Sequence, residues 1–176
     1  MRAAWHEVER RLGPYRLRPV FWWEAGQIAA LERLVFLEPL TGRQVAGLLL
    51  RPGTVYAGAF DGRKLAAYFG FAVFGGYAHV LANVTHPDYR RRGLGEGILR
   101  AMEPVARAGG ARGFLGEVRP SNTVQRRILA GLGWRVVFRI PAFFQNGEDA
   151  LIVWRGFDDR RPREGRASEP APAGRG

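Results

Sequence analysis

The chain has 176 residues, 47% of them hydrophobic, which is enough for one domain with a core and for additional segments at its ends. It contains no cysteine and no apolar run of about 18 residues, which excludes disulfides, a cysteine nucleophile and a membrane-spanning helix. The opening segment MRAAWHEVERRLG interrupts its apolar residues with charges and cannot be a signal-peptide core, so we expect a cytoplasmic protein. The spacing of the three histidines does not suggest a metal site, and we expect no bound metal. They are His6, His79 and His86.

The formal net charge of +11 is carried almost entirely by arginine, since Lys64 is the only lysine. Such a surface favours contact with RNA, a ribosome or the phosphates of a cofactor. A sequence rich in arginine, alanine, glycine and proline is equally typical of a genome with biased base composition. Charge alone therefore leaves the partner open.

The first part of the chain is expected to form helices around one strand. Periodicity predicts a short helical extension over residues 1–14, a strand over 15–20, and helices over about 24–36 and 42–51. Pro39 disfavours helix at Glu38 and separates the last two helices.

The middle of the chain predicts a three-stranded meander over residues 54–60, 64–74 and 77–85. Asp61-Gly62 is a tight-hairpin signal, and Gly75-Gly76 marks the second turn. A long helix over about 93–108 follows, with Pro104 predicting a kink or an earlier end.

The last part of the chain predicts two further strand regions separated by a helix. The expected elements are a strand over 114–118, a helix over 123–130 and an antiparallel pair over 135–141 and 149–154. From Gly156 the composition turns to Arg, Asp, Glu, Gly, Pro and Ala without periodicity, so we expect residues 156–176 to be disordered.

The most informative stretch is Asn83 to Leu99, NVTHPDYRRRGLGEGIL. A strand there turns through three closely spaced glycines into an amphipathic helix. The first-turn amides of such a helix lack intrahelical partners and lie at the positive end of its dipole. This arrangement predicts an anion site. The spacing is not the dinucleotide fingerprint, because Ile98 stands where the third glycine would be.

The segment HPDYRRRGLG resembles the (Gln/Arg)-x-x-Gly-x-(Gly/Ala) signature of the GNAT superfamily of acetyl-CoA-dependent N-acetyltransferases. Together with GEVRPSN and GLGW, it is most similar to the ribosomal-protein-alanine N-acetyltransferase branch. The resemblance runs over residues 15–155 and implies one acetyltransferase domain there. The implied fold is α+β (mixed α/β), with a mostly antiparallel central sheet of about seven strands, splayed at its middle and flanked by about four helices.

The resemblance also implies a binding site for acetyl-CoA as co-substrate. Loop amides would hold the pyrophosphate, and the preceding strand segment would pair with the pantetheine and face the thioester carbonyl. The implied cofactor-binding residues are Asn83, Val84, Thr85, Arg90, Arg91, Arg92, Gly93, Leu94, Gly95, Glu96 and Asn122.

Glu117 is the candidate catalytic residue. It interrupts an otherwise apolar strand, and the matching glutamate of the resembled branch is the proton acceptor. The alternative is an ordinary exposed strand carboxylate. Asn122 matches an asparagine that contacts acetyl-CoA in the branch, although it could act only as a helix cap, and the two roles are compatible.

One position departs from the resembled family. Leu129 stands where the family has a tyrosine that protonates the leaving thiolate. Three alternatives stay open: the thiolate leaves unassisted or into water, another hydroxyl such as that of Tyr89 or Tyr77 supplies the proton, or catalysis is lost. A coenzyme A thiol has an acidity near that of cysteine, about 8.5, so unassisted departure costs only a few kcal/mol.

The acceptor is expected to be a weakly basic primary amine. Deprotonation at about pH 7 costs roughly 1.4 kcal/mol for an α-amine and roughly 4.6 kcal/mol for a lysine, which favours a protein N-terminus or a small amine for a lone glutamate base. Glu38 could receive the amine or be a solvated loop residue. Phe143-Phe144 stands where the branch has paired tyrosines beside its peptide groove, or simply covers the sheet. A small-molecule acetyltransferase and a catalytically weak acyl-CoA-binding or ribosome-associated module are the alternatives.

Overall fold

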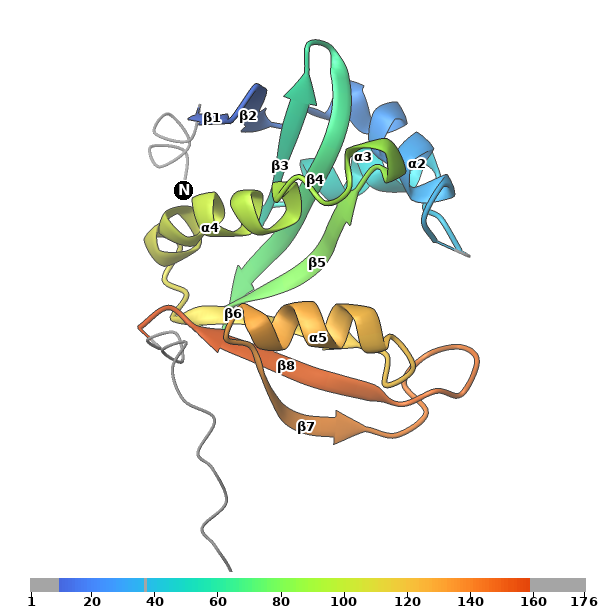
Figure 1. Ribbon diagram of the computed structural model, residues 1–176, viewed down its shortest axis with the longest axis vertical. Coiled ribbons are helices and arrows are strands. Elements are labelled where there is room, and N and C mark those ends of the chain that lie inside the picture. The colour runs from blue at the N-terminus through green and yellow to red at the C-terminus, as the bar shows by residue number, and fades with distance from the viewer. Residues whose placement is uncertain (1–9, 37, 159–176) are drawn as a thin grey trace, which may run out of the picture.

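The computed structural model describes residues 10–36 and 38–158, which form one mixed eight-stranded sheet with helices on both faces (Figure 1). The described strands lie in the order β1-β2-β3-β4-β5-β6-β8-β7, and all neighbours are antiparallel except β5 and β6. The strands are β1 (Arg10–Leu12), β2 (Tyr15–Pro19), β3 (Thr54–Asp61), β4 (Lys64–Phe74), β5 (Tyr77–Thr85), β6 (Gly113–Val118), β7 (Arg135–Ile140) and β8 (Ala150–Gly156).

Four α-helices and two short 3-10 helices connect the described strands. Helices α2 and α3 cover one face of the sheet, α4 covers the other, and α5 lies over β6 and β8 (Figure 1). Each face has its own apolar core. No helix in the described ranges is long and apolar enough to cross a bilayer. The helices are η1 (Trp22–Glu24), α2 (Ala25–Arg33), α3 (Gly42–Leu50), η2 (Pro87–Tyr89), α4 (Leu94–Ala108) and α5 (Thr123–Gly131).

The predicted order of elements is confirmed from β2 onward, with end shifts of a few residues. Helix α2 ends at Arg33 rather than near residue 36, and α4 continues through Pro104 to Ala108. Pro104 is tolerated there because α4 has a continuous buried stripe that includes Ile98, Met102 and Val105. Packing of an apolar face supplies most of the stability of such a helix.

The helical extension predicted for residues 1–14 is wrong in its described part. Residues 10–12 form the edge strand β1, which pairs with β2 in the register Arg10 to Leu17. Gly13 turns the chain with a φ of 58°, and the partly buried Leu12 packs against the core beneath α4. Pairing with a distant strand has overridden the local helical spacing. Residues 1–9 lie outside the described residues.

The predicted disordered tail begins too early. Gly156 is the last residue of β8, and Phe157 is buried against the ring of Phe114 with 5.0 Å between centroids. Phe157 is the only large apolar residue in that stretch of the sequence, and the charged residues around it hid its role from pattern analysis. The rest of the tail, residues 159–176, lies outside the described range, and its disorder stays a prediction.

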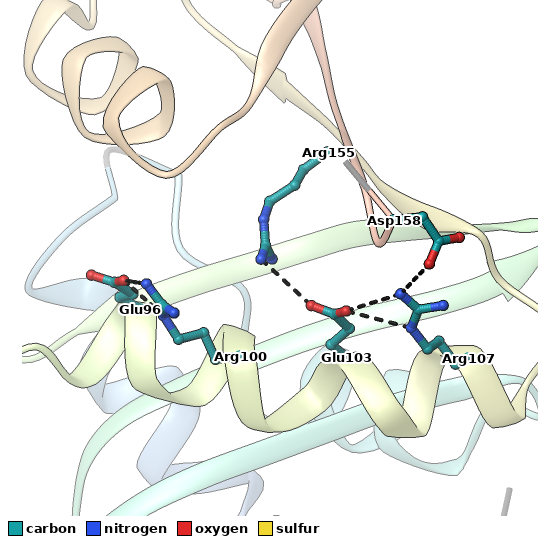
Figure 2. A network of polar contacts seen from close by, with 6 residues as sticks. All are labelled: Glu96, Arg100, Glu103, Arg107, Arg155 and Asp158. Carbon is teal, nitrogen blue, oxygen red and sulfur yellow. Dashed lines mark hydrogen bonds and ion pairs between the residues drawn. The ribbon is translucent and has the colours of Figure 1, made fainter. Parts of the chain in front are cut away.

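A network of ion pairs connects α4 to β8 and to Asp158 just after it (Figure 2). Arg155 on β8 contacts Glu103 on α4 at 3.5 Å, and Arg107 contacts Asp158 at 3.0 Å. Pairs with exposed members contribute little stability each, so we interpret the network as orienting α4 against β8. The residues that make this connection are Glu103, Arg107, Arg155 and Asp158, and Glu96 and Arg100 form a further pair nearer the start of α4.

A buried carboxylate fixes the connection between α2 and α3. Glu32 is 5% exposed, and its two oxygens accept hydrogen bonds from the Tyr68 hydroxyl and the Leu40 N–H, each at 2.7 Å. Its backbone carbonyl also accepts from the N–H groups of Val35 and Phe36. Burial of the hydroxyl and its bond to Glu32 raise the pKa of Tyr68 above its usual range, so Tyr68 remains a donor. One residue thus holds both ends of this loop.

We predict that Tyr68→Phe destabilises the protein by about 1–3 kcal/mol, because it removes a donor from a buried carboxylate. Urea unfolding of both proteins measures the change. Tyr56→Phe is the matched control, since Tyr56 lies on the neighbouring strand with its ring 6.3 Å from that of Tyr68. An equal loss in the two variants would contradict the role assigned to the Tyr68 to Glu32 bond.

Candidate active site

The site lies where the sheet separates into two halves. β5 and β6 pair only through Ala78 with Phe114 and His79 with Leu115, and then diverge. In β5, the register against β4 passes from Val80 to Ala82, so Leu81 is the extra residue of a β-bulge. A bulge bends its strand and increases the local twist. The resulting V between β5 and β6 is visible in Figure 1.

A groove of about 690 Å³ lies in this V, and residues of β5, α4, β6 and α5 line it. Six of the predicted site residues line it, and they come from four separate elements or loops. A second hollow of about 380 Å³ between α5 and β7 contains none of the predicted site residues. The predicted residues in the groove are Asn83, Thr85, Gly95, Glu96, Glu117 and Asn122.

The predicted anion loop forms the turn between β5 and α4. Arg91 and Gly93 both have positive φ, 60° and 72°, and Gly93 is the residue before the first turn of α4. At Gly95 an added Cβ would lie 3.3 Å from Asn83 Oδ1 and 3.6 Å from Thr85 Oγ1. Glycine therefore lets the helix start close to β5, with its first-turn amides at the groove.

The remaining predicted cofactor residues do not line the groove. Val84 and Leu94 are each 2% exposed, so their side chains belong to the two cores. Arg92 donates to the Tyr15 hydroxyl at 2.9 Å and to the Asp88 carbonyl at 3.0 Å, which holds the loop in place. Arg90, Arg91 and Gly93 are exposed beside the groove.

Glu117 lies at the narrow end of the V, with its side chain 22% exposed. Its partner is His79, whose Nε2 is 2.8 Å from one carboxylate oxygen and 3.0 Å from the other. The hydrogen bond to Glu117 raises the pKa of His79, although burial opposes this. His79 was missed as a site residue because its partner is 38 positions away, and only the parallel pairing of β5 with β6 brings them together.

Asn122 and Leu129 both lie on α5 or its cap. The Asn122 side chain accepts a hydrogen bond from the Gln125 N–H at 3.0 Å, so the predicted cap is present, and the residue also lines the groove. Leu129 lines the groove without a polar group. Neither Tyr89, which donates to Asp61 at 2.9 Å, nor Tyr77, which packs on Phe74, lines the groove.

Two apolar segments form the outer walls of the groove. Val35 and Phe36 follow α2, and Phe143 and Phe144 belong to the β7–β8 loop. In Figure 1 these segments lie above and below the open end of the V. Glu38, a predicted acceptor contact, is exposed and does not line the groove. Among the described residues, no cluster of three or more His, Asp and Glu side chains could hold a metal ion.

The groove joins two features of different chemistry. It is continuous from the α4 N-terminus, which favours negative charge, to the carboxylate of Glu117. Beyond His79, β5 has no strand partner on the side of β6 among the described strands. That edge is available for main-chain pairing with a ligand amide.

The sequence is similar to those of known acetyltransferases. Over 128 residues the chain is 25% identical to an uncharacterized N-acetyltransferase, MJ1530, of Methanocaldococcus jannaschii, covering 72% of this chain and 81% of that protein. Over 91 residues it is 32% identical to a putative [ribosomal protein bS18]-alanine N-acetyltransferase of Bacillus subtilis, covering 51% of this chain and 60% of that protein.

The fold is shared with solved structures. The ribosomal-protein-S18-alanine N-acetyltransferase of Escherichia coli superposes with a TM-score of 0.73 at 19% identity, covering 85% of this chain and 97% of that one. Other structures of this fold hold acetyl-CoA or coenzyme A. The sequence model of the acetyltransferase (GNAT) family matches residues 32–134, more than half of the chain. The chain therefore belongs to the GNAT family of acetyl-CoA-dependent N-acetyltransferases.

Proposed function

We propose that this acetyltransferase transfers the acetyl group of acetyl-CoA directly to the α-amine of a protein N-terminus, with Glu117 as the base. The observation that carries the proposal is the position of Glu117, a carboxylate at the narrow end of a groove that begins at the glycine-bearing loop. A general base must lie within hydrogen-bonding reach of the proton that it removes. The resemblance to alanine N-acetyltransferases supports the choice of acceptor.

In this proposal, the loop binds the pyrophosphate mainly through main-chain N–H groups. Residues Arg91 to Glu96 supply the amides, while Arg90 and Arg91 add positive charge at the rim. The Arg92 side chain acts indirectly, because its contacts with Tyr15 and Asp88 shape the loop. Asn83 to Thr85 pair with the pantetheine and direct a main-chain N–H at the thioester oxygen, and Asn122 contacts the arm from α5.

The chemical step forms one C–N bond and breaks one C–S bond. Glu117 accepts a proton from the acceptor ammonium, and the free amine attacks the thioester carbon. The negative charge that develops on the carbonyl oxygen is stabilised by the main-chain donor of β5. When the C–S bond breaks, coenzyme A leaves as a thiolate, because Leu129 has no proton to give. The attacking nitrogen, which is cationic after the attack, gives its second proton to water, and the thiolate takes up a proton from the solvent.

His79 holds the base in position. Its contact with both oxygens of Glu117 restricts rotation of the carboxylate. We therefore assign His79 as a positioning residue for Glu117.

Two alternative functions can be separated from this one by experiment. The same groove could acetylate a small amine, and Leu129 favours a catalytically weak acyl-CoA-binding module. Contact with a ribosome or RNA through the basic surface also stays a prediction, because charge is its only support. Thiol release measured with N-terminal peptides and with small amines separates these alternatives.

We predict that Glu117→Gln lowers kcat/KM by about 10² to 10⁴-fold, because glutamine cannot accept the proton. Thiol release with a peptide acceptor measures the rate, and calorimetry should find the affinity for acetyl-CoA unchanged. The control is Glu38→Gln, the same substitution at an exposed position outside the groove. Turnover at the wild-type rate by Glu117→Gln would remove the base assignment.

We predict that Glu117→Gln also lowers the pKa of His79. The hydrogen bond to the carboxylate is the main cause of the raised value, and burial, which remains, acts in the opposite direction. NMR titration of the imidazole resonances measures this without any acceptor. The resonances of His86, which faces Asp88, serve as the internal control. An unchanged His79 titration would contradict the His79–Glu117 contact.

We predict that Gly95→Val weakens acetyl-CoA binding on the order of tenfold, equivalent to about 1.4 kcal/mol. The branched side chain would press on Asn83 and Thr85 and displace the start of α4. Calorimetry measures the affinity. Gly47→Val is the control, since Gly47 lies within α3 and an added Cβ there meets nothing within 4 Å. Equal affinities of Gly95→Val and wild type would contradict the placement of the cofactor loop.

A further inference from the structure

The acceptor end of the groove has an apolar rim. Four large apolar side chains from three separate segments line it and remain between 37% and 47% exposed. Exposed apolar side chains that gather around one opening mark a binding site rather than a part of the core. These rim residues are Val35, Phe36, Leu81 and Phe143.

Polar contacts hold the first wall of the rim in place. The backbone carbonyl of Glu32 accepts from the N–H groups of Val35 and Phe36 at 2.9 Å and 2.8 Å, respectively. The buried carboxylate of the same residue binds the N–H of Leu40 at the far end of the loop. The ring of Phe36, which is 44% exposed, therefore follows a backbone N–H that is hydrogen-bonded to α2.

The second wall is the β7–β8 loop, and charged residues hold it in place. Arg119 lies 3.8 Å from the ring centroid of Phe144 and contacts Glu148 at 3.3 Å. Asp149 accepts from the N–H of Ala142 at 2.9 Å. Hydrogen bonds from Ser121, together with the Arg119 guanidinium, lower the pKa of Glu148, so these contacts persist in neutral solution. The ring of Phe143 is 47% exposed on this braced loop.

The groove offers little to a charged group beside the reacting amine. Of the described residues that line it, Glu96, Glu117 and Arg119 carry a formal charge. Glu96 pairs with Arg100 beside the cofactor loop, and Arg119 is engaged by Glu148. Glu117 is reserved for the ammonium group in the proposed reaction. A charged acceptor side chain would lose water without gaining a partner.

We propose that the acceptor carries a large apolar group next to its reactive amine, and that Phe36 and Phe143 bind that group. For a peptide acceptor, this means an N-terminal residue of the Leu, Met or Phe type rather than alanine. The inference rests on the proposed function for the position of the amine at Glu117. It deepens that function by naming the class of acceptor, since phenylalanine rings can bind apolar surface but cannot hydrogen-bond a peptide.

The test uses peptides that differ only at residue 1, with Ala, Leu, Phe, Asp or Lys there, and one small apolar amine, phenylethylamine. We expect kcat/KM for the Leu and Phe peptides to exceed that for the Ala peptide by about tenfold or more, with the Asp and Lys peptides lowest. Phe36→Ser and Phe143→Ser should reduce this preference. Phe138→Ser, which removes an aromatic ring that is 54% exposed but lies outside the groove, should retain it.

The possible outcomes separate the two proposals. Equal or better turnover of the Ala, Asp or Lys peptides would overturn the apolar class and leave the N-terminal acceptor standing. Turnover of phenylethylamine alone would support the apolar class and overturn the N-terminal acceptor. A preference for Leu that survives both rim substitutions would overturn the assignment to Phe36 and Phe143. If no acceptor reacts and none binds by calorimetry in the presence of coenzyme A, both proposals fail.

Discussion

The short contact between β5 and β6 determines the organisation of this protein. Continuous pairing along these strands would close the sheet and leave no room for a ligand. Because pairing stops after His79, and because the bulge at Leu81 bends β5, one edge of each strand faces an open groove. The polar groups of these strand edges, which would be costly to leave unpaired in a core, are here available to a ligand.

The two cores support this opening from opposite faces. Helix α4 packs on one face and presents its N-terminus at the groove, and α2 and α3 pack on the other and carry the apolar wall that includes Phe36. The ion pairs of α4 with Arg155 and Asp158 connect it to the far half of the sheet. The arrangement gives the cofactor and the acceptor separate approaches to the same carboxylate, Glu117.

Local signals account for what could be predicted from the sequence. Asp61-Gly62 and Gly75-Gly76 define turns through their backbone preferences, so β4 and β5 were predicted with their observed bounds. The glycine-bearing loop and Glu117 were singled out by their residue patterns and by the resemblance to the GNAT family, and their roles stay predictions. Features that depend on long-range contacts were missed. Strand β1 was missed because its pairing with β2 contradicts the local helical pattern. His79 was missed because only a parallel strand contact brings it to Glu117. The helical spacing placed Glu32 in a helix, but it did not show that Glu32 is buried and fixes the loop, because its partners Tyr68 and Leu40 lie outside that helix.

The most direct test of this account is a crystal structure of the protein with acetyl-CoA and a non-reactive peptide acceptor. We expect the pyrophosphate at the amides of Arg91 to Glu96, the pantetheine along β5 in the V, and the acceptor nitrogen within hydrogen-bonding distance of a Glu117 oxygen. A thioester bound outside the V, or an acceptor amine on the side of the groove away from Glu117, would contradict the account.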